Sequence, residues 1–179
     1  NRCPVMFASS TQAALPNLYG RSKKAGEELL DQYARETGAK VYVYRFPTVF
    51  GKWAKPNHNS AIATICYNIS HELPVVVNDE SAVLRLAYID DVAESLCDLL
   101  DGKATKEGPY CVVPALYTAK LGDVAERIRV LGDVAHRQAA EPFIGRVDLI
   151  ATGLDRLPTA LTTAIMGNLL KHGDLVVTD

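Results

Sequence analysis

Tyr19 and Lys23 are the residues of this sequence whose types and spacing most directly suggest chemistry. They are four residues apart, so on one helix they would lie on the same face, about one turn apart. A lysine cation beside a tyrosine favours the phenolate form, which suits a group that gives a proton to a carbonyl or takes one from an alcohol. Ser10 ends an expected strand just upstream, and its hydroxyl could hold the same oxygen. This is the arrangement that hydride transfer with a nicotinamide cofactor needs.

The Tyr-x-x-x-Lys spacing is a weak signal when taken alone, because an amphipathic helix with a surface lysine has the same pattern. Its context strengthens the chemical interpretation. The pair opens an expected helix, Ser9-Ser10 precede it at a strand end, and a second strand that ends in Arg45-Phe46-Pro47 follows it.

The elements that would position these residues alternate along the chain. Apolar and β-branched runs predict strands over 5–10, 41–46, 75–78, 84–89 and 110–113. Apolar periodicity and capping residues predict helices over 19–37, 60–72, 90–100, 118–134 and 157–171, with loops over 11–18 and 50–59. Strands that alternate with helices indicate α/β layers around parallel strands.

Composition excludes several other classes of function. The chain has 179 residues, a formal net charge of -2 and a single adjacent basic pair, Lys23-Lys24, so nucleic-acid binding is not expected. No apolar run approaches the about 20 residues that span a bilayer. The four cysteines and four histidines are scattered without metal-ligand spacing, which favours free thiols in a reducing cytoplasm over a zinc site.

At this point the residues resemble a known family, the extended short-chain dehydrogenase/reductases of the NAD-dependent epimerase/dehydratase group, which act on nucleotide sugars. The resemblance rests on Ser9-Ser10, Tyr19-Gly20-x-Ser22-Lys23, Arg45-Phe46-Pro47-x-x-Phe50-Gly51 and Tyr88-Ile89-Asp90-Asp91-Val92-Ala93. A denser run from Phe50 to Tyr67 resembles the capsular-polysaccharide synthesis reductases, which reduce a 4-keto UDP-N-acetyl-deoxyhexose.

The resemblance implies a fold and a reaction. The expected fold is the C-terminal part of a Rossmann-type doubly wound parallel sheet with a small substrate-binding region, over residues 1–136, followed by an uncertain helical segment over 137–179. The expected function is an NADP- or NAD-dependent reductase or epimerase of a nucleotide sugar, in the cytoplasm, with a homo-oligomer possible. No metal, nucleic acid or membrane partner is expected.

The same resemblance implies roles for single residues. Tyr19 matches the catalytic acid/base, Lys23 the lysine that bonds the nicotinamide ribose, and Ser10 the hydroxyl that orients the substrate oxygen, with Thr11 as the substitute if the alignment slides by one. Residues that match the segment flanking the nicotinamide are Phe46, Pro47 and Thr48.

The substrate side departs from the family pattern at two positions. Thr48 stands where the wider family often has asparagine, so it keeps a hydroxyl and loses an amide. Leu84 holds the place of the diphosphate-binding arginine, and Arg85 comes one step later, which on a strand reverses the face. Other expected substrate contacts, with solvated loop or core roles as their alternatives, are Lys52, Trp53, Lys55 and Asn59. Asp90 and Asp91 are interpreted as a helix-capping pair.

The Gly-rich turn that binds the cofactor pyrophosphate is missing, because none of the twelve glycines forms G-x-G-x-x-G or G-x-x-G-x-x-G. If the resemblance holds, that turn and the adenosine site lie before Asn1, and this chain alone binds a dinucleotide poorly. The absent turn also motivates an alternative from another class, a non-catalytic α/β binding or regulatory module of the same fold.

Overall fold

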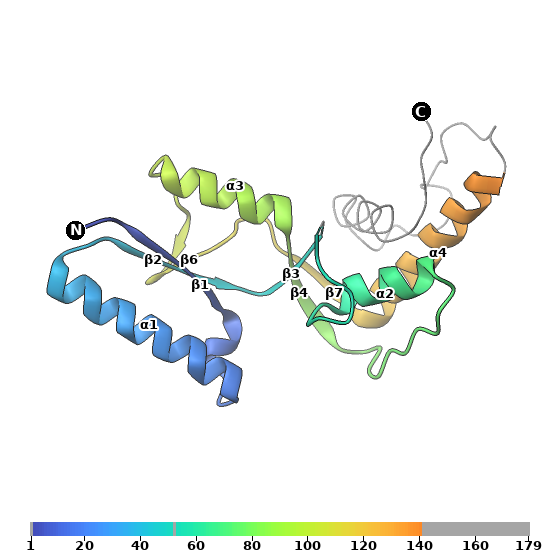
Figure 1. Ribbon diagram of the computed structural model, residues 1–179, viewed down its shortest axis with the longest axis horizontal. Coiled ribbons are helices and arrows are strands. Elements are labelled where there is room, and N and C mark those ends of the chain that lie inside the picture. The colour runs from blue at the N-terminus through green and yellow to red at the C-terminus, as the bar shows by residue number, and fades with distance from the viewer. Residues whose placement is uncertain (1, 52, 141–179) are drawn as a thin grey trace. The chain divides into compact units, whose positions relative to one another are not determined.

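The computed structural model describes residues 2–51 and 53–140, with side chains described as far as Leu131. The chain divides into two compact units, each built from separate stretches of sequence (Figure 1). Unit one takes residues up to 47 together with 90–116, and unit two takes 48–89 together with the chain from 117 onward. The predicted limit at residue 136 falls inside the last described helix, and the domain limits stay a prediction.

Unit one is built on a four-stranded sheet in the order β1-β2-β6-β5. β1 (Val5–Ser10), β2 (Val41–Phe46) and β6 (Tyr110–Cys111) run parallel, and β5 (Lys106–Glu107) is antiparallel to β6. The first two strands have the predicted bounds, whereas β6 stops two residues before its predicted end. This is the parallel, Rossmann-like α/β sheet that the sequence predicts.

Two helices cover opposite faces of this sheet (Figure 1). α1 (Leu18–Thr37) begins at Asn17, whose side chain accepts the Gly20 amide at 2.6 Å, and it ends at Gly38 in the left-handed conformation, as predicted. α3 (Ile89–Leu100) lies on the other face, where the Tyr44 hydroxyl donates to the Ser95 carbonyl at 3.0 Å. The two-sided covering buries Tyr44 completely.

Unit two is a three-stranded sheet packed on two helices. β3 (Thr48–Phe50) is parallel to β4 (Val83–Tyr88), which pairs in the antiparallel sense with β7 (Tyr117–Lys120). α2 (Ala61–Ser70) and α4 (Leu121–Ala140) complete the layer. The core residues that are at most 1% exposed are Phe50, Ile62, Cys66, Leu86, Val124, Ile128 and Leu131.

Several predicted elements are wrong. Residues 75–78 form no strand, although Val75 and Val77 still pack against the core. Thr118 pairs with Arg85 in β7 and does not open a helix, and α3 begins one residue earlier than predicted, with Asp90 inside its first turn. A short 3-10 helix, η1 (Thr11–Ala14), occupies a predicted loop, and β3 lies where no element is predicted, apart from Phe50 at the start of the predicted 50–59 loop. The predicted helix over 157–171 lies outside the described residues.

Within the described part of the chain, no helix combines the length and the apolar character that crossing a bilayer requires.

Candidate active site

Ser10 lies at the carboxyl end of β1, the edge of a parallel sheet where open α/β folds bind ligands. It is the register partner of Phe46 at the end of β2, so the two strand ends meet side by side. Ser10 caps η1, because its hydroxyl oxygen accepts the Gln12 amide at 3.1 Å. That bond uses an oxygen lone pair and leaves the hydroxyl proton to donate elsewhere. Thr11 is exposed at the start of η1.

Tyr19 and Lys23 occupy the first turns of α1, beside the same strand end. The Lys23 ammonium donates to the Ala8 carbonyl at 3.0 Å and lies 5.7 Å from the centre of the Tyr19 ring. It also lies 5.5 Å from the centre of the Phe7 ring. Tyr19 is 50% exposed. The predicted pair therefore stands on one face of one helix and lies against β1.

Gly20 lets the start of α1 approach the chain that follows Ser10. A side-chain carbon at position 20 would lie 2.6 Å from the Leu15 carbonyl oxygen and closer still to that of Gln12. Both obstacles are backbone atoms, which cannot rotate away. The sequence offered a signal for this residue, because a glycine inside a helix costs stability and usually has a packing reason.

The nicotinamide-side residues are divided between the two units. Phe46 ends β2 and stacks on Tyr44 with 5.2 Å between ring centres, and Pro47 is the last residue of unit one before the crossing. Thr48 begins β3 in unit two and is exposed. Unit one alone therefore brings together Ser10, Tyr19, Lys23 and Phe46.

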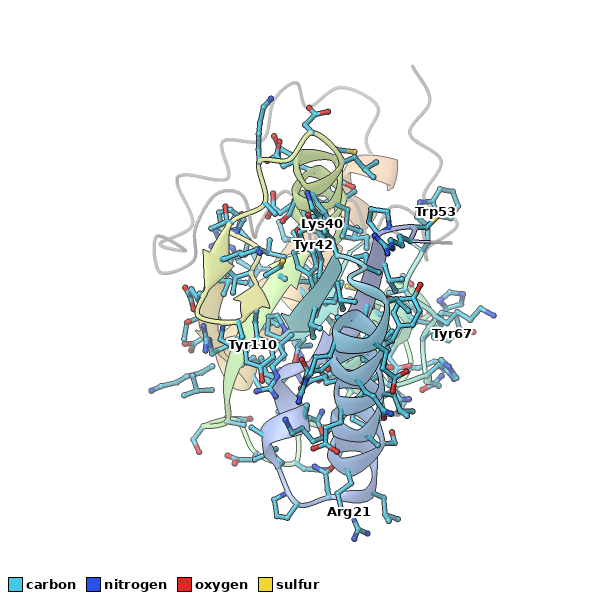
Figure 2. All side chains as sticks on the ribbon, turned by 90° about the vertical axis from the view of Figure 1, so that its left-hand side faces the viewer. Arg21, Lys40, Tyr42, Trp53, Tyr67 and Tyr110 are labelled. Carbon is cyan, nitrogen blue, oxygen red and sulfur yellow. The ribbon has the colours of Figure 1, made fainter. Side chains whose placement is uncertain are left out.

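The predicted substrate contacts of unit two lie on an irregular loop and one strand. Trp53, labelled in Figure 2, is 78% exposed and has a φ of 71°, and Asn59 has a φ of 55°. Lys55 is exposed on the same loop, and Lys52 lies outside the described residues. Non-glycine residues rarely adopt positive φ, and such strain is often found in ligand-binding loops.

Arg85 is exposed on β4, while its neighbour Leu84 packs against the core of unit two. The one-residue displacement that the sequence shows therefore places Arg85 on the face of the strand opposite to Leu84.

Glu27, for which no spacing in the sequence predicts a role, is 5% exposed and accepts hydrogen bonds from residues of two strands. Its carboxylate accepts the Ser9 hydroxyl at 2.5 Å and two guanidinium nitrogens of Arg45, at 2.9 and 2.6 Å. Burial by itself would raise the pKa of Glu27, but the hydrogen bonds from Arg45 and Ser9, with the nearby Arg45 and Lys24 charges, hold that pKa below its ordinary value. The hydrogen bond to Glu27 also raises the pKa of Arg45.

Comparison with protein families matches residues 7–112 to the NAD dependent epimerase/dehydratase family. The match covers more than half of the 179 residues and includes the serine, tyrosine and lysine described above. The chain belongs to the NAD dependent epimerase/dehydratase family, as the sequence predicts.

Within this family, the chain is similar to two curated relatives and to one solved structure. The chain is 42% identical over 125 residues to UDP-2-acetamido-2,6-beta-L-arabino-hexul-4-ose reductase of Pseudomonas aeruginosa, covering 70% of this chain and 33% of the relative. It is 32% identical over 111 residues to UDP-glucuronate 4-epimerase 1 of Arabidopsis thaliana, covering 58% of this chain and 25% of that one. The capsular polysaccharide assembling protein CapF of Staphylococcus aureus matches with a TM-score of 0.81 and 30% identity, over 99% of this chain and 46% of CapF.

The residues of unit one fit the nicotinamide end of the family's cofactor. Lys23 uses one ammonium donor on Ala8, and an ammonium has three, so donors are left for ribose hydroxyls. The Ser10–Phe46 strand ends supply the sheet edge at which such a ring would lie. No glycine pattern of this sequence matches the turn that holds the pyrophosphate.

Proposed function

We propose that the protein carrying this chain is an NAD(P)-dependent reductase or epimerase of a nucleotide-activated sugar. The substrate we infer is a UDP-4-keto-deoxyhexose, and the product serves capsular or surface polysaccharide synthesis in the cytoplasm. One observation carries the proposal: in a chain of this family, Lys23 bonds Ala8 two residues before Ser10 and lies 5.7 Å from the centre of the Tyr19 ring. The Pseudomonas aeruginosa reductase and CapF support the substrate class.

In the proposed reaction, each residue handles one part of the sugar C4 carbonyl. Ser10 donates its hydroxyl proton in a hydrogen bond to the oxygen, since its own oxygen is engaged by Gln12. Tyr19 gives that oxygen its proton during reduction and takes it back during oxidation. Lys23 holds the ribose through the ammonium donors that Ala8 leaves unused. The cofactor, when bound, supplies or accepts the hydride at C4.

The remaining predicted residues divide between cofactor and substrate. We assign Phe46, Pro47 and Thr48 to the nicotinamide, and Thr11, Lys52, Trp53, Lys55 and Asn59 to the nucleotide sugar. Arg85 is the weakest member of the set, because its neighbour Leu84 holds the family position. Lys52 and Lys55, on the 51–59 loop, would then bind the diphosphate through ion pairs.

Tyr19→Phe tests the reaction in the protein that carries this chain. The substitution removes only the hydroxyl, so turnover of a 4-keto UDP-sugar with NADPH should fall at least about a hundredfold, the usual share of a general acid. NADPH binding, followed by nicotinamide fluorescence, should stay within about twofold. Tyr33→Phe, the same change further along α1, is the matched control.

Full activity of Tyr19→Phe would remove Tyr19 from the proposal. A wild-type protein that turns over no keto or hydroxy UDP-sugar with either cofactor would favour the alternative, a non-catalytic α/β binding or regulatory module. The absent pyrophosphate-binding turn is the observation behind that alternative.

A further inference from the structure

We propose that Glu27 is a positioning residue, which locks α1, and with it Tyr19 and Lys23, onto the two strand ends that carry Ser10 and Phe46. Its catalytic consequence rests on the function proposed above. The lock itself consists of contacts within unit one.

Glu27 lies on the same face of α1 as the chemical pair. Tyr19, Lys23 and Glu27 follow one another at intervals of four residues, which places their side chains along one side of a helix. Lys23 bonds the carbonyl of Ala8, and Glu27 accepts the hydroxyl of Ser9. This face is therefore attached to two consecutive residues of β1, immediately before Ser10.

The same carboxylate also reaches the second strand. Arg45 is the register partner of Ser9, so both side chains leave the sheet on the face that α1 covers. One carboxylate oxygen of Glu27 accepts both Ser9 Oγ and Arg45 Nε, and the other accepts Arg45 Nη2. A bidentate guanidinium–carboxylate pair fixes an angle as well as a distance, which a single contact would not.

An aromatic ring holds the guanidinium plane from the third strand. The Arg45 guanidinium carbon lies 3.8 Å from the centre of the Tyr110 ring, which Figure 2 labels. Arg45 is therefore set between β6 and α1 and has little freedom to follow Glu27 if the helix moves.

A role in orientation explains this cluster better than a role in stability alone. Burying an ion pair costs desolvation that roughly cancels its attraction, so such pairs are weak sources of stability. Proton transfer, in contrast, tolerates little displacement, and a shift of about 1 Å can cost about a hundredfold in rate. A lock on the helix that carries Tyr19 and Lys23 acts on that distance.

Glu27→Gln in the complete protein is the test, with Glu28→Gln as its matched control. Glu28→Gln removes the same charge from the same helix, but Glu28 is exposed and pairs only weakly with Lys24, at 3.9 Å. We expect Glu27→Gln to lower kcat about tenfold or more and to leave KM for the nucleotide sugar within about threefold. Glu28→Gln should change neither.

A second readout does not depend on turnover. With 3-fluorotyrosine incorporated at position 19, the 19F resonance should move in Glu27→Gln and stay in place in Glu28→Gln. Arg45→Lys keeps the positive charge but loses the paired guanidinium hydrogen bonds to Glu27, so it should also move the resonance. This variant replaces Glu27→Gln in the test if Glu27→Gln does not fold.

If both Glu27→Gln and Arg45→Lys fold and leave the 19F resonance unchanged, the proposal is overturned. It is also overturned if Glu28→Gln moves that resonance equally. In an active enzyme, a kcat within twofold of wild type for Glu27→Gln overturns it as well. A wild-type protein without turnover would count against the proposed function only, and the resonance would then decide on the lock.

Discussion

The Ser10 oxygen caps η1 while its hydroxyl proton is left to donate, which is compatible with the role proposed for this residue. The oxygen accepts the Gln12 amide and starts η1, while the proton remains for a ligand. Lys23 divides its donors in the same way, because one ammonium hydrogen bonds the Ala8 carbonyl and the others are left for a ligand. At this scale the chemical residues take part in the local structure that places them.

The contribution of the Glu27 carboxylate to stability should depend on pH in the acid range. Because its pKa is lower in the folded chain than the ordinary 4.5, the stability it contributes is complete above about 4.5 and is lost as the pH falls through the folded value. The difference in free energy of unfolding between wild type and Glu27→Gln should therefore be larger at pH 6 than at pH 3. Urea unfolding at the two pH values measures it.

Glu28→Gln is the control in that experiment and should show little dependence on pH. A difference between wild type and Glu27→Gln that stays constant, or grows, on acidification would contradict the lowered pKa.

At the level of single residues, the sequence reveals candidates with short spacings more readily than contacts between distant positions. Ser10, Tyr19 and Lys23 stand out because short spacings carry them. Glu27 does not, since its partner Arg45 is eighteen residues away and only the β1–β2 register brings the two together. A lone glutamate in a helix otherwise has the pattern of a solvated face.

The decisive element is the first turn of α1, which is held from three sides. Asn17 caps it, Gly20 lets it approach η1, and Lys23 attaches it to β1. None of these contacts requires a ligand, so the turn is set before any substrate arrives. Such preorganisation lowers the cost of reaching a reactive geometry.

Gly20→Ala should destabilise the protein even though alanine favours helices by about 1 kcal/mol. The added carbon meets the Gln12 and Leu15 carbonyls, so the helix start must move, at a net cost of about 1–3 kcal/mol. Chemical denaturation measures the loss. Arg21→Ala, at the exposed next position, should change stability by less than about 0.5 kcal/mol. A stabilised Gly20→Ala variant would show that the close approach does not exist.

The sequence predicted the long elements of unit one well, because local periodicity and caps determine them. It failed where pairing is distant in sequence. β7 owes its strand to the register of Thr118 with Arg85, and a helical pattern follows it directly. Residues 75–78 have strand composition but lack a partner strand, so burial of Val75 and Val77 is all that their apolar character produces.

At the scale of the whole molecule, the residues with proposed roles divide between the two units. The proposed acid/base group and its helix lie in unit one, and most of the proposed nucleotide-sugar contacts lie in unit two. Each unit has its own sheet and its own packing. The division could not be predicted from the sequence, because both units are assembled from separate stretches.

The core of unit two should respond strongly to a cavity. Leu86 is fully buried in the middle of β4, so Leu86→Ala should cost about 2–5 kcal/mol in free energy of unfolding. Val83→Ala, on the same strand but 63% exposed, should cost less than about 1 kcal/mol. Hydrogen exchange of the β4 amides measures both. Equal protection in the two variants would contradict the core assignment.

The interleaving of the two units also sets an order of events during synthesis. The sheet of unit one takes its third strand from residues 110–111, which leave the ribosome only after β3, α2 and β4 have been made. Until then the edge of β2 that pairs with β6 is open, and the contact between Arg45 and the Tyr110 ring cannot form. A nascent chain thus holds Ser10, Tyr19 and Lys23 long before it can complete the sheet that supports them.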